Sequence, residues 1–363
     1  MTLAVPPHIL AIPPYVPGKP IEELERERGI RGSIKLASNE NPLGPSPRAL
    51  AALAATLETL HRYPDSTGYC LTRKIARRLG LQPEQVVLGN GSDEILALLA
   101  RAFLQPGDEV LLPEPAFAMY AIEARASGAV PVSVPLNDFQ TDLEAMAGSV
   151  GPRTRIVFLN TPHNPTGHRI AREALAGFLA RLPDEVIAVV DEAYIEFVRD
   201  PGEMDPRPLL EGPRPVVVLR TFSKAYGLAG LRVGYGLMPA GLAAVLHRVR
   251  PPFNVNRAAQ VAAEAALDDE AFLAESRRVV HEGIDVLRTG LERLGLFCLP
   301  SEANFLMFAL PGEARPVYEG LLARGVIVRP LASYGYPRHL RVSVGRPEEN
   351  RRFLDALRAV LGR

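Results

Sequence analysis

Two stretches of the sequence decide the fold: residues 186–194, VIAVVDEAY, and residues 216–237, VVVLRTFSKAYGLAGLRVGYGL. Each opens with a run of β-branched and aliphatic residues, which is typical of a strand buried on both faces. Polar residues follow each apolar run at once. In open α/β folds, the carboxyl ends of parallel strands meet at one edge of the sheet, and ligands bind there. The two stretches therefore predict an α/β fold with polar groups gathered at that edge.

The alternation of short strands with helices extends over residues 46–255 and indicates a mostly parallel central sheet with helices on both faces. The strands that we expect are Val86–Leu88, Val110–Leu112, Val130–Val134, Ile156–Leu159, Val186–Val190, Val216–Leu219 and Leu231–Leu237. The helices that we expect are Ala49–Leu60, Thr72–Leu79, Asp93–Phe103, Phe117–Ala126 and Arg172–Leu182.

The pattern changes after about Pro251, where helices lead into a smaller α+β unit. We expect this small domain over residues 256–363, a large domain over 46–255, and an N-terminal segment, 1–45, that joins the small domain. The N-terminal segment is Pro-rich apart from a charged helix near Ile21–Arg28. The elements expected in the small domain are helices at Arg257–Leu267 and Ala271–Leu294 and strands at Asn304–Phe308, Val326–Val328 and Leu340–Val344.

Composition excludes several classes of function. The chain of 363 residues has 41 basic and 41 acidic residues, so its formal charge is zero, which argues against nucleic acid or an anionic membrane as the main partner. No apolar run approaches the ~18 residues of a membrane helix. The two cysteines, Cys70 and Cys298, form no Cys-x-x-Cys pair, so neither a disulfide framework nor a metal site is predicted. The cytoplasm is the expected location.

Asp191 is the first polar residue after a strand that we expect to be buried, so its carboxylate should lie at the floor of the site. Taken alone, a helix cap or a turn would explain an aspartate at this position equally well. Lys224 follows the next strand, and lysine fills only 4 of the 41 basic positions of this chain. A primary amine forms an imine whereas a guanidinium does not, so a lysine at this position favours amine chemistry. A phosphate contact, an ion pair or a surface lysine remain open.

Three further motifs lie at predicted strand ends. Residues 89–94, GNGSDE, join a strand to a helix start, where free backbone N–H groups bind anions. Arg232 lies in a glycine-rich loop, and Asn164 opens an Asn-Pro-Thr-Gly turn. The loop matches neither the dinucleotide nor the nucleotide-triphosphate pattern. Each motif is weak alone, but together they supply what pyridoxal phosphate needs: an anion site, an amide, a carboxylate and an amine.

The chain resembles, over nearly its full length, the histidinol-phosphate aminotransferase family of fold type I pyridoxal-phosphate enzymes. The motifs that carry the resemblance occur in the family's order. They are Asn39-Glu40-Asn41-Pro42, Gly44-Pro45-Ser46-Pro47, Tyr63-Pro64-Asp65, Gly91-Ser92-Asp93-Glu94, Asn164-Pro165-Thr166-Gly167, Asp191-Glu192-Ala193-Tyr194, residues 221–235 (TFSKAYGLAGLRVGY), Arg250-Pro251-Pro252-Phe253-Asn254-Val255, Asn304-Phe305 and Leu340-Arg341-Val342.

The resemblance implies a pyridoxal 5′-phosphate cofactor and a role for each matching residue. Lys224 would form the Schiff base and move the proton, and Asp191 would pair with the pyridine nitrogen. The phenolic oxygen would be bound by Asn164 and Tyr194. Phe117 would stack on the ring. The residues expected at the cofactor phosphate are Ser92, Asp93, Ser223 and Arg232, together with Tyr63 reaching across a homodimer into the partner's site.

On the substrate side, the resemblance implies that Arg341 binds the anionic group, with Arg329, Tyr15 and Asn164 assisting. The implied reaction moves an amino group between L-histidinol phosphate and 2-oxoglutarate in histidine biosynthesis. Three alternatives stay open: an aromatic or broad-specificity amino-acid aminotransferase, a threonine-phosphate decarboxylase, and a binding module without activity. His163 departs from the asparagine that is commoner in the family, and no role is expected for it.

Overall fold

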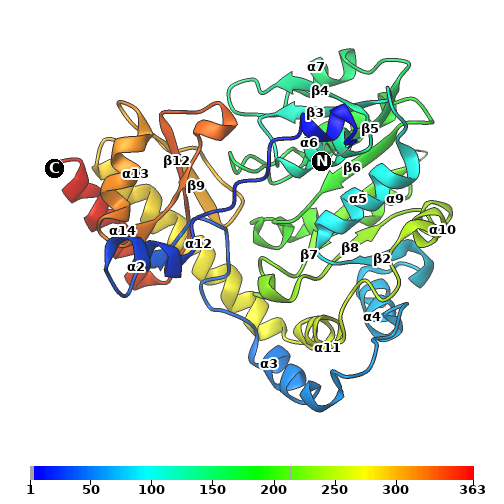
Figure 1. Ribbon diagram of the computed structural model, residues 1–363, viewed down its shortest axis with the longest axis horizontal. Coiled ribbons are helices and arrows are strands. Elements are labelled where there is room, and N and C mark those ends of the chain that lie inside the picture. The colour runs from blue at the N-terminus through cyan, green and yellow to red at the C-terminus, as the bar shows by residue number, and fades with distance from the viewer. Residues whose placement is uncertain (1–3, 213) are drawn as a thin grey trace.

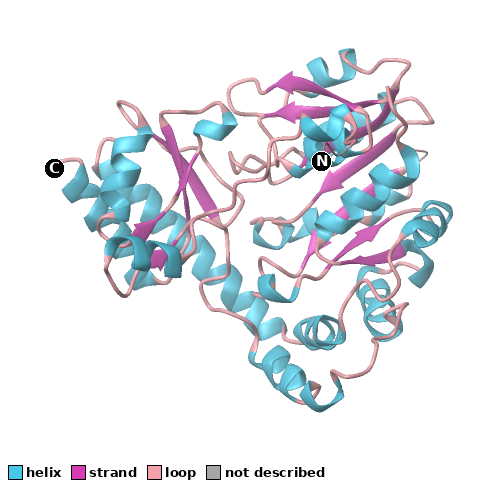
Figure 2. Ribbon diagram, viewed as in Figure 1, coloured by secondary structure: helices cyan, strands magenta, loops and turns pink. Residues whose placement is uncertain are grey.

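The computed structural model describes residues 4–212 and 214–363, which form two units (Figure 1). In the larger unit the described residues build a seven-stranded sheet in the order β2-β8-β7-β6-β5-β3-β4 (Figure 2). Strand β8 runs antiparallel to both of its neighbours, and all other neighbouring pairs are parallel. The strands are β2 (Val86–Gly89), β3 (Glu109–Glu114), β4 (Val130–Pro135), β5 (Thr154–Asn160), β6 (Ile187–Asp191), β7 (Val216–Thr221) and β8 (Gly234–Leu237).

Helices cover both faces of this sheet, because successive side chains of its buried strands point to opposite faces. In β6, for example, Val189 belongs to one apolar core and Val190 to the other. Helices on the Val189 face are α5 (Ser92–Phe103), α6 (Met119–Ala126) and α10 (Ala240–Val249). Helices on the Val190 face are α3 (Pro47–Ala54), α4 (Tyr69–Leu79), α7 (Leu143–Gly148), α8 (Arg172–Arg181), α9 (Arg207–Leu210) and α11 (Arg257–Ala266).

The smaller unit, on the left of Figure 1, has a core of its own and an antiparallel sheet in the order β11-β12-β9. A separate parallel pair joins β1 of the N-terminal segment to β10. The strands of the smaller unit are β1 (Ile34–Lys35), β9 (Phe305–Ala309), β10 (Val326–Ile327), β11 (Arg329–Pro330) and β12 (His339–Ser343). Its helices are α2 (Ile21–Arg28), α12 (Glu270–Arg293), α13 (Ala314–Leu322) and α14 (Pro347–Val360).

The N-terminal segment crosses between the two units. Helix α1 (Pro7–Leu10) lies against α6 of the larger unit, whereas α2 and β1 pack on the smaller one (Figure 1). Helix α12 also belongs to both, since Leu273 packs against both cores. Helix α11 packs on α3 and α4 in the core of the larger unit. We therefore propose a domain boundary near Leu273 rather than at residues 255 and 256.

Three predicted elements are wrong in detail. The helix expected over Ala49–Leu60 ends at Ala54, because the Thr56 hydroxyl donates to the Leu53 carbonyl and competes with the helical bond; a 3₁₀ turn follows. The strand expected over Leu231–Leu237 begins only at Gly234, after a second 3₁₀ turn. The predicted strand Val326–Val328 is divided, so that its first two residues pair with β1 and the chain then enters β11.

Six 3₁₀ turns complete the described structure: η1 (Leu57–Thr59), η2 (Pro83–Gln85), η3 (Ile195–Phe197), η4 (Pro201–Met204), η5 (Ala229–Leu231) and η6 (Ala332–Tyr334). No helix among the described residues combines the length and the apolar character that a membrane crossing needs.

Candidate active site

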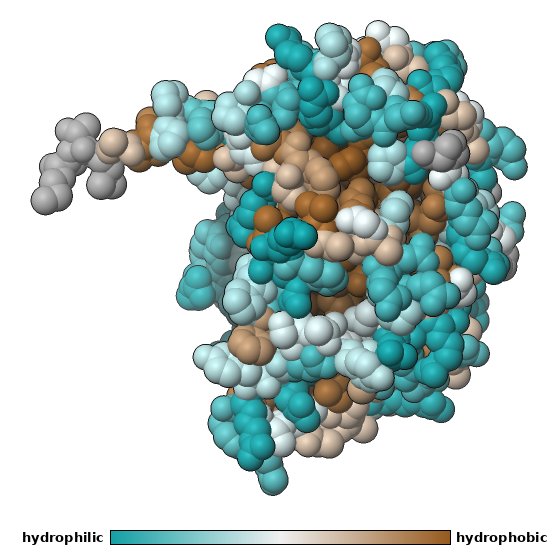
Figure 3. All heavy atoms as spheres, turned by 90° about the vertical axis from the view of Figure 1, so that its right-hand side faces the viewer, coloured by the Kyte–Doolittle hydropathy of each residue, from teal (hydrophilic) through white to brown (hydrophobic). Residues whose placement is uncertain are grey.

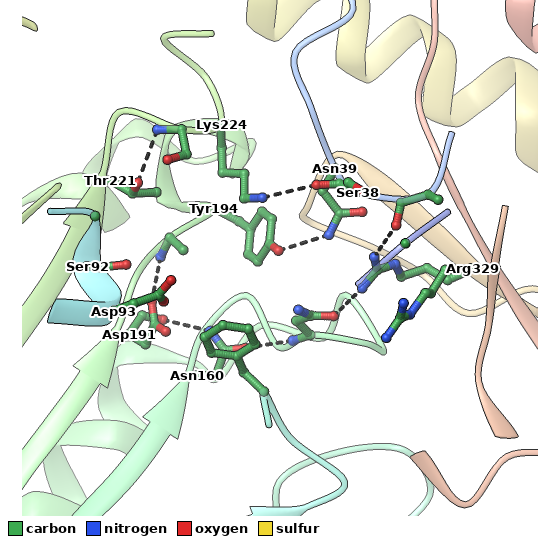
Figure 4. Close-up of a pocket in the computed structure, with 18 of the residues that line it drawn as sticks. Ser38, Asn39, Ser92, Asp93, Asn160, Asp191, Tyr194, Thr221, Lys224 and Arg329 are labelled. Atoms are coloured by element: carbon green, nitrogen blue, oxygen red, sulfur yellow. Dashed lines mark hydrogen bonds between the residues drawn. The ribbon is translucent and has the colours of Figure 1, made fainter. Parts of the chain in front are cut away.

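A cavity of about 170 Å³ opens at the carboxyl edge of the large sheet (Figure 4). The last residues of three adjacent strands line it: Asn160 of β5, Asp191 of β6 and Thr221 of β7. Of the thirteen residues singled out from the sequence, all but Tyr63 line this cavity. They are Tyr15, Ser92, Asp93, Phe117, Asn164, Asp191, Tyr194, Ser223, Lys224, Arg232, Arg329 and Arg341.

Asp191 is buried at the floor of the cavity with two donors and no cation. The Tyr120 hydroxyl donates to its Oδ2 at 2.6 Å, and the Ala193 N–H donates to its Oδ1 at 3.0 Å. Burial raises the pKa of Asp191 to about 6, because a carboxylate is disfavoured away from water. Among the described residues no basic side chain forms an ion pair with it. The site therefore suits a ligand that brings a positively charged N–H.

Lys224 projects into the cavity from the loop after β7, where its Nζ donates to the Ser38 carbonyl at 3.2 Å (Figure 4). Burial, and then the positive charge of Arg341, lower the pKa of Lys224 to about 8. A larger fraction of this amine is thus neutral near pH 7 than for an exposed lysine. A neutral amine is the form that attacks a carbonyl.

An anion site lies where α5 begins. Gly91 precedes the helix with φ +76°, and Arg232, at φ +58°, brings its guanidinium against it. A Cβ at Gly91 would lie 2.7 Å from Arg232 Nη2, so a larger residue there would displace the guanidinium from this position. Arg232 also lies 3.4 Å from the Asp93 carboxylate. The free N–H groups of the first helical turn and the guanidinium together match an anion.

Asn164 and Tyr194 line the same cavity and contact Arg341 of the smaller unit and Asn39 of the N-terminal segment, respectively. The Arg341 guanidinium donates to Asn164 Oδ1, so the amide N–H₂ of Asn164 stays free to donate to a ligand. The Tyr194 hydroxyl accepts from Asn39 Nδ2 at 2.9 Å. Burial raises the pKa of Tyr194 to about 12, so this hydroxyl keeps its proton at neutral pH.

Arg341 and Arg329 form a pair of like charges. They lie directly opposite each other in the antiparallel pairing of β12 with β11, so both side chains leave the same face of the sheet and line the cavity. Arg341 is 5 % exposed, and its Nη2 donates to the Ala37 carbonyl at 2.8 Å. Arg329 donates to the Val16 carbonyl at 3.0 Å, next to Tyr15. No carboxylate among the described residues forms an ion pair with either arginine, so the two neighbouring cations indicate a site for an anionic group.

The comparisons with known proteins agree with this geometry. Residues 31–357 match the family model "Aminotransferase class I and II". Histidinol-phosphate aminotransferase 2 of Pseudomonas fluorescens is 50% identical over 359 residues, which are 98% of this chain and 97% of that protein. The histidinol-phosphate aminotransferase of Moorella thermoacetica is 48% identical over 97% of this chain and 92% of its own. The chain belongs to the histidinol-phosphate aminotransferase family.

Among solved structures, the histidinol-phosphate aminotransferase of Sinorhizobium meliloti in complex with pyridoxal-5′-phosphate superimposes with a TM-score of 0.92. It is 29% identical, and the match covers 100% of this chain and 98% of that one. The fold type I architecture predicted from the sequence is thereby confirmed, with its mostly parallel central sheet and smaller α+β unit.

Sequence reasoning missed five residues that line the cavity or contact Asp191: Asn39, Tyr120, Asn160, Thr221 and Tyr334. Tyr120 was within reach of sequence reasoning, because it lies three residues after Phe117 and packs edge-on against its ring at 5.7 Å. Tyr334 and Asn39 reach the cavity only through contacts between segments far apart in the sequence.

Tyr63 and His163, which the sequence analysis also considered, are not among the residues that line the cavity. Tyr63 is 81 % exposed and stacks on Phe253, with 4.6 Å between ring centroids. Its predicted contact with a partner's cofactor stays a prediction. His163 is buried with its Nδ1 3.0 Å from the Thr166 hydroxyl, and burial lowers its pKa to about 4.

Proposed function

We propose that this protein is an aminotransferase that moves an amino group between L-histidinol phosphate and 2-oxoglutarate in histidine biosynthesis, giving imidazole-acetol phosphate and L-glutamate. Its relatives support this reaction, since those at 50% and 48% identity over nearly the whole chain bear the name histidinol-phosphate aminotransferase. The single observation in the structure that carries the proposal is the pair Arg329 and Arg341 facing the cavity.

The residues present fit pyridoxal 5′-phosphate. Within the described part of the chain, Asp191 has hydrogen-bond donors but no cationic partner, as a partner of a protonated pyridine nitrogen should. The start of α5, with Ser92 and the backbone N–H of Asp93, would hold the phosphate together with Ser223 and Arg232. Phe117 would cover the ring. When bound, the cofactor supplies an electron sink for the charge that develops on the carbon bearing the amine.

Each side chain then has a separate task. Lys224 would bind the cofactor aldehyde through its amine and carry the proton between two carbon atoms of the reacting group. The carboxylate of Asp191 would keep the proton on the ring nitrogen. Asn164 and Tyr194 would donate hydrogen bonds to the phenolic oxygen, which is consistent with the free amide N–H₂ and the protonated hydroxyl described above.

The arginine pair explains the choice of substrate. Histidinol phosphate carries its anion as a phosphate, and glutamate carries a carboxylate at the equivalent place. A phosphate has nearly two charges at neutral pH and more acceptor oxygens, so it should engage Arg341 and Arg329 together, with Tyr15 nearby. A carboxylate needs only the planar fork of one arginine.

A coupled glutamate assay tests the proposal. The purified holoenzyme with 2-oxoglutarate should form glutamate fastest from histidinol phosphate, compared with phenylalanine, tyrosine and threonine phosphate. Faster turnover of phenylalanine or tyrosine would favour a broad amino-acid aminotransferase. Release of carbon dioxide from threonine phosphate without glutamate formation would favour a decarboxylase.

We also propose that the protein is a homodimer. Apolar side chains that a single chain exposes include Leu10, Val16 and Leu57, and the start of the N-terminal segment projects from the molecule in Figure 3. A second copy would cover such side chains, and Tyr63 would then reach the partner's cofactor phosphate.

A cytoplasmic location is proposed because both cysteines are free.

A further inference from the structure

Strand β12 of the smaller unit directs two side chains toward the candidate active site. Arg341 and Ser343 are two residues apart, so they leave the same face of the strand. Arg341 donates to Asn164. Ser343 contacts Asn39, which in turn contacts the Tyr194 hydroxyl. One strand thus reaches, by two separate routes, both groups proposed to bind the cofactor's phenolic oxygen.

The Ser343 hydroxyl determines how the Asn39 amide is turned. It accepts from the Asn39 backbone N–H at 2.9 Å and donates its one hydrogen to Asn39 Oδ1 at 2.8 Å. Both residues are buried, so water does not compete for these bonds. Because the carbonyl oxygen of the amide faces Ser343, its N–H₂ group must face the other way, toward Tyr194.

This orientation fixes the role of the Tyr194 hydroxyl. Asn39 Nδ2 donates to it at 2.9 Å, so the hydroxyl accepts on that side (Figure 4). Its own hydrogen cannot point at Asn39 and is left for an acceptor in the cavity that Tyr194 lines. The phenolic oxygen of the cofactor would be that acceptor.

Asn39 itself is held in an uncommon conformation. Its φ of +56° lies in the left-handed region, which few non-glycine residues adopt. The buried Asn304 side chain donates to the Asn39 carbonyl at 3.0 Å and secures the backbone there. Three hydrogen bonds from the smaller unit, two with Ser343 and one with Asn304, therefore hold Asn39 in place. Asn39 in turn contacts the Tyr194 hydroxyl.

We propose that Asn39, held by Ser343, is a positioning residue that sets the direction in which Tyr194 donates its hydrogen, and so tunes the charge on the cofactor's phenolic oxygen. The inference rests on the proposed function, because it requires the cofactor. The other charged or titratable groups around Tyr194 are Lys224, Arg341, Asp191 and Tyr334. A substitution at Asn39 changes none of these side chains.

The test is the pH dependence of the absorbance of bound pyridoxal phosphate. Asn39→Gly removes the amide, and glycine accepts the positive φ. Without a fixed donor, the negative charge on the cofactor's phenolic oxygen is less stabilised. The loss matters most once the nitrogen that would join Lys224 to the cofactor has lost its proton, because that proton would otherwise share the charge. The apparent pKa of the absorbance change should therefore rise by about 1 unit. Tyr194→Phe should raise it similarly, and Ser343→Ala should raise it less.

The double variant Asn39→Gly with Tyr194→Phe decides whether Asn39 acts through the tyrosine. A shift equal to that of Tyr194→Phe alone supports the proposal, whereas additive shifts overturn it. Asn350→Ala is the matched control: among the described residues, this buried side-chain amide of the smaller unit bonds only to Gly345, so its loss should lower thermal stability and leave the apparent pKa unchanged.

The same titration distinguishes a failure of the proposed function from a failure of the positioning role of Asn39. If the wild-type protein shows no absorbance change with pyridoxal phosphate, the proposed function and this inference both fall. If wild type titrates normally and Asn39→Gly titrates like it, only the positioning role falls.

Discussion

The two sides of the candidate active site are built in different ways. On the larger unit, functional groups lie at the ends of adjacent parallel strands or in the loops that follow at once, as with Asp191 and Lys224. On the smaller unit, Arg341 and Arg329 stand on short antiparallel strands, close to an N-terminal segment that crosses both units. The first side is fixed by the core of the sheet, and the second by contacts between units. The cofactor chemistry should therefore depend mainly on the first side, apart from the positioning of Tyr194 through Asn39, and the choice of substrate mainly on the second.

Lys224→Arg should have the largest effect. It keeps a positive charge of similar length but removes the amine that bonds the cofactor and moves the proton, so transamination should fall by at least about 10³-fold. The coupled glutamate assay measures this loss, with circular dichroism as a control that the fold is intact. Turnover near the wild-type rate would contradict the assignment of Lys224.

Asp191→Asn should have the next largest effect, because a neutral amide cannot hold a proton on the ring nitrogen. Single-turnover rates with histidinol phosphate should fall by roughly 10²–10³-fold while cofactor still binds. A rate equal to that of wild type would exclude this role.

The raised pKa of Asp191 adds a pH prediction. In the cofactor-free protein the carboxyl holds a proton below about pH 6. Pairing with a protonated ring nitrogen requires the loss of that proton, so cofactor affinity should be greatest above pH 6 and should decrease as the pH falls through 6. Equilibrium dialysis of pyridoxal phosphate between pH 5 and 8 measures this. Asp191→Asn should flatten the profile, and an unchanged profile in that variant would assign the effect to another group.

On the smaller unit, replacement of the two arginines should separate the two half-reactions. Arg341→Lys should slow both by about 10- to 100-fold, since one charged hydrogen-bonding fork is lost for either anion. Arg329→Lys should slow the histidinol-phosphate half more than the glutamate half. Stopped-flow absorbance measures each half alone. Equal losses in both halves for Arg329→Lys would remove it as a phosphate-selective contact and favour a general aminotransferase.

Tyr63→Phe should have the smallest effect, a loss of cofactor affinity of about tenfold or less, because one hydrogen bond is removed from a site with several donors. Hybrid dimers sharpen the test. A Tyr63→Phe subunit paired with a Lys224→Ala subunit should give one site with both defects and one with neither. Hybrids without a wild-type-like site would argue against a shared site.

Sequence reasoning succeeded where local order determines position. Asp191, Lys224 and Asn164 each follow a buried apolar run, so the period of the strands alone places them at one sheet edge. The start of α5 and the glycine-rich loop were likewise recognisable from glycine and helix-start signals. All of these lie on the larger unit, and all of them line the cavity.

The rest depended on contacts that no local pattern reports. Asn39 and Ser343 are 304 residues apart in the chain, yet two hydrogen bonds join them. The predicted strand Val326–Val328 also conceals a change of partner, so that the pairing of Arg329 with Arg341 emerges only from the sheet register. Long-range pairing of short strands is weakly encoded by hydrophobic pattern, which is why the substrate side was the harder one to predict.

One measurement tests the central claim most directly: the absorbance of the purified holoenzyme, followed through each half-reaction separately. Histidinol phosphate added alone should abolish the absorbance of the bound cofactor aldehyde, with one equivalent of imidazole-acetol phosphate formed per site. Subsequent 2-oxoglutarate should restore it and release one equivalent of glutamate. No change with histidinol phosphate, together with full conversion by phenylalanine or tyrosine, would contradict the proposed reaction.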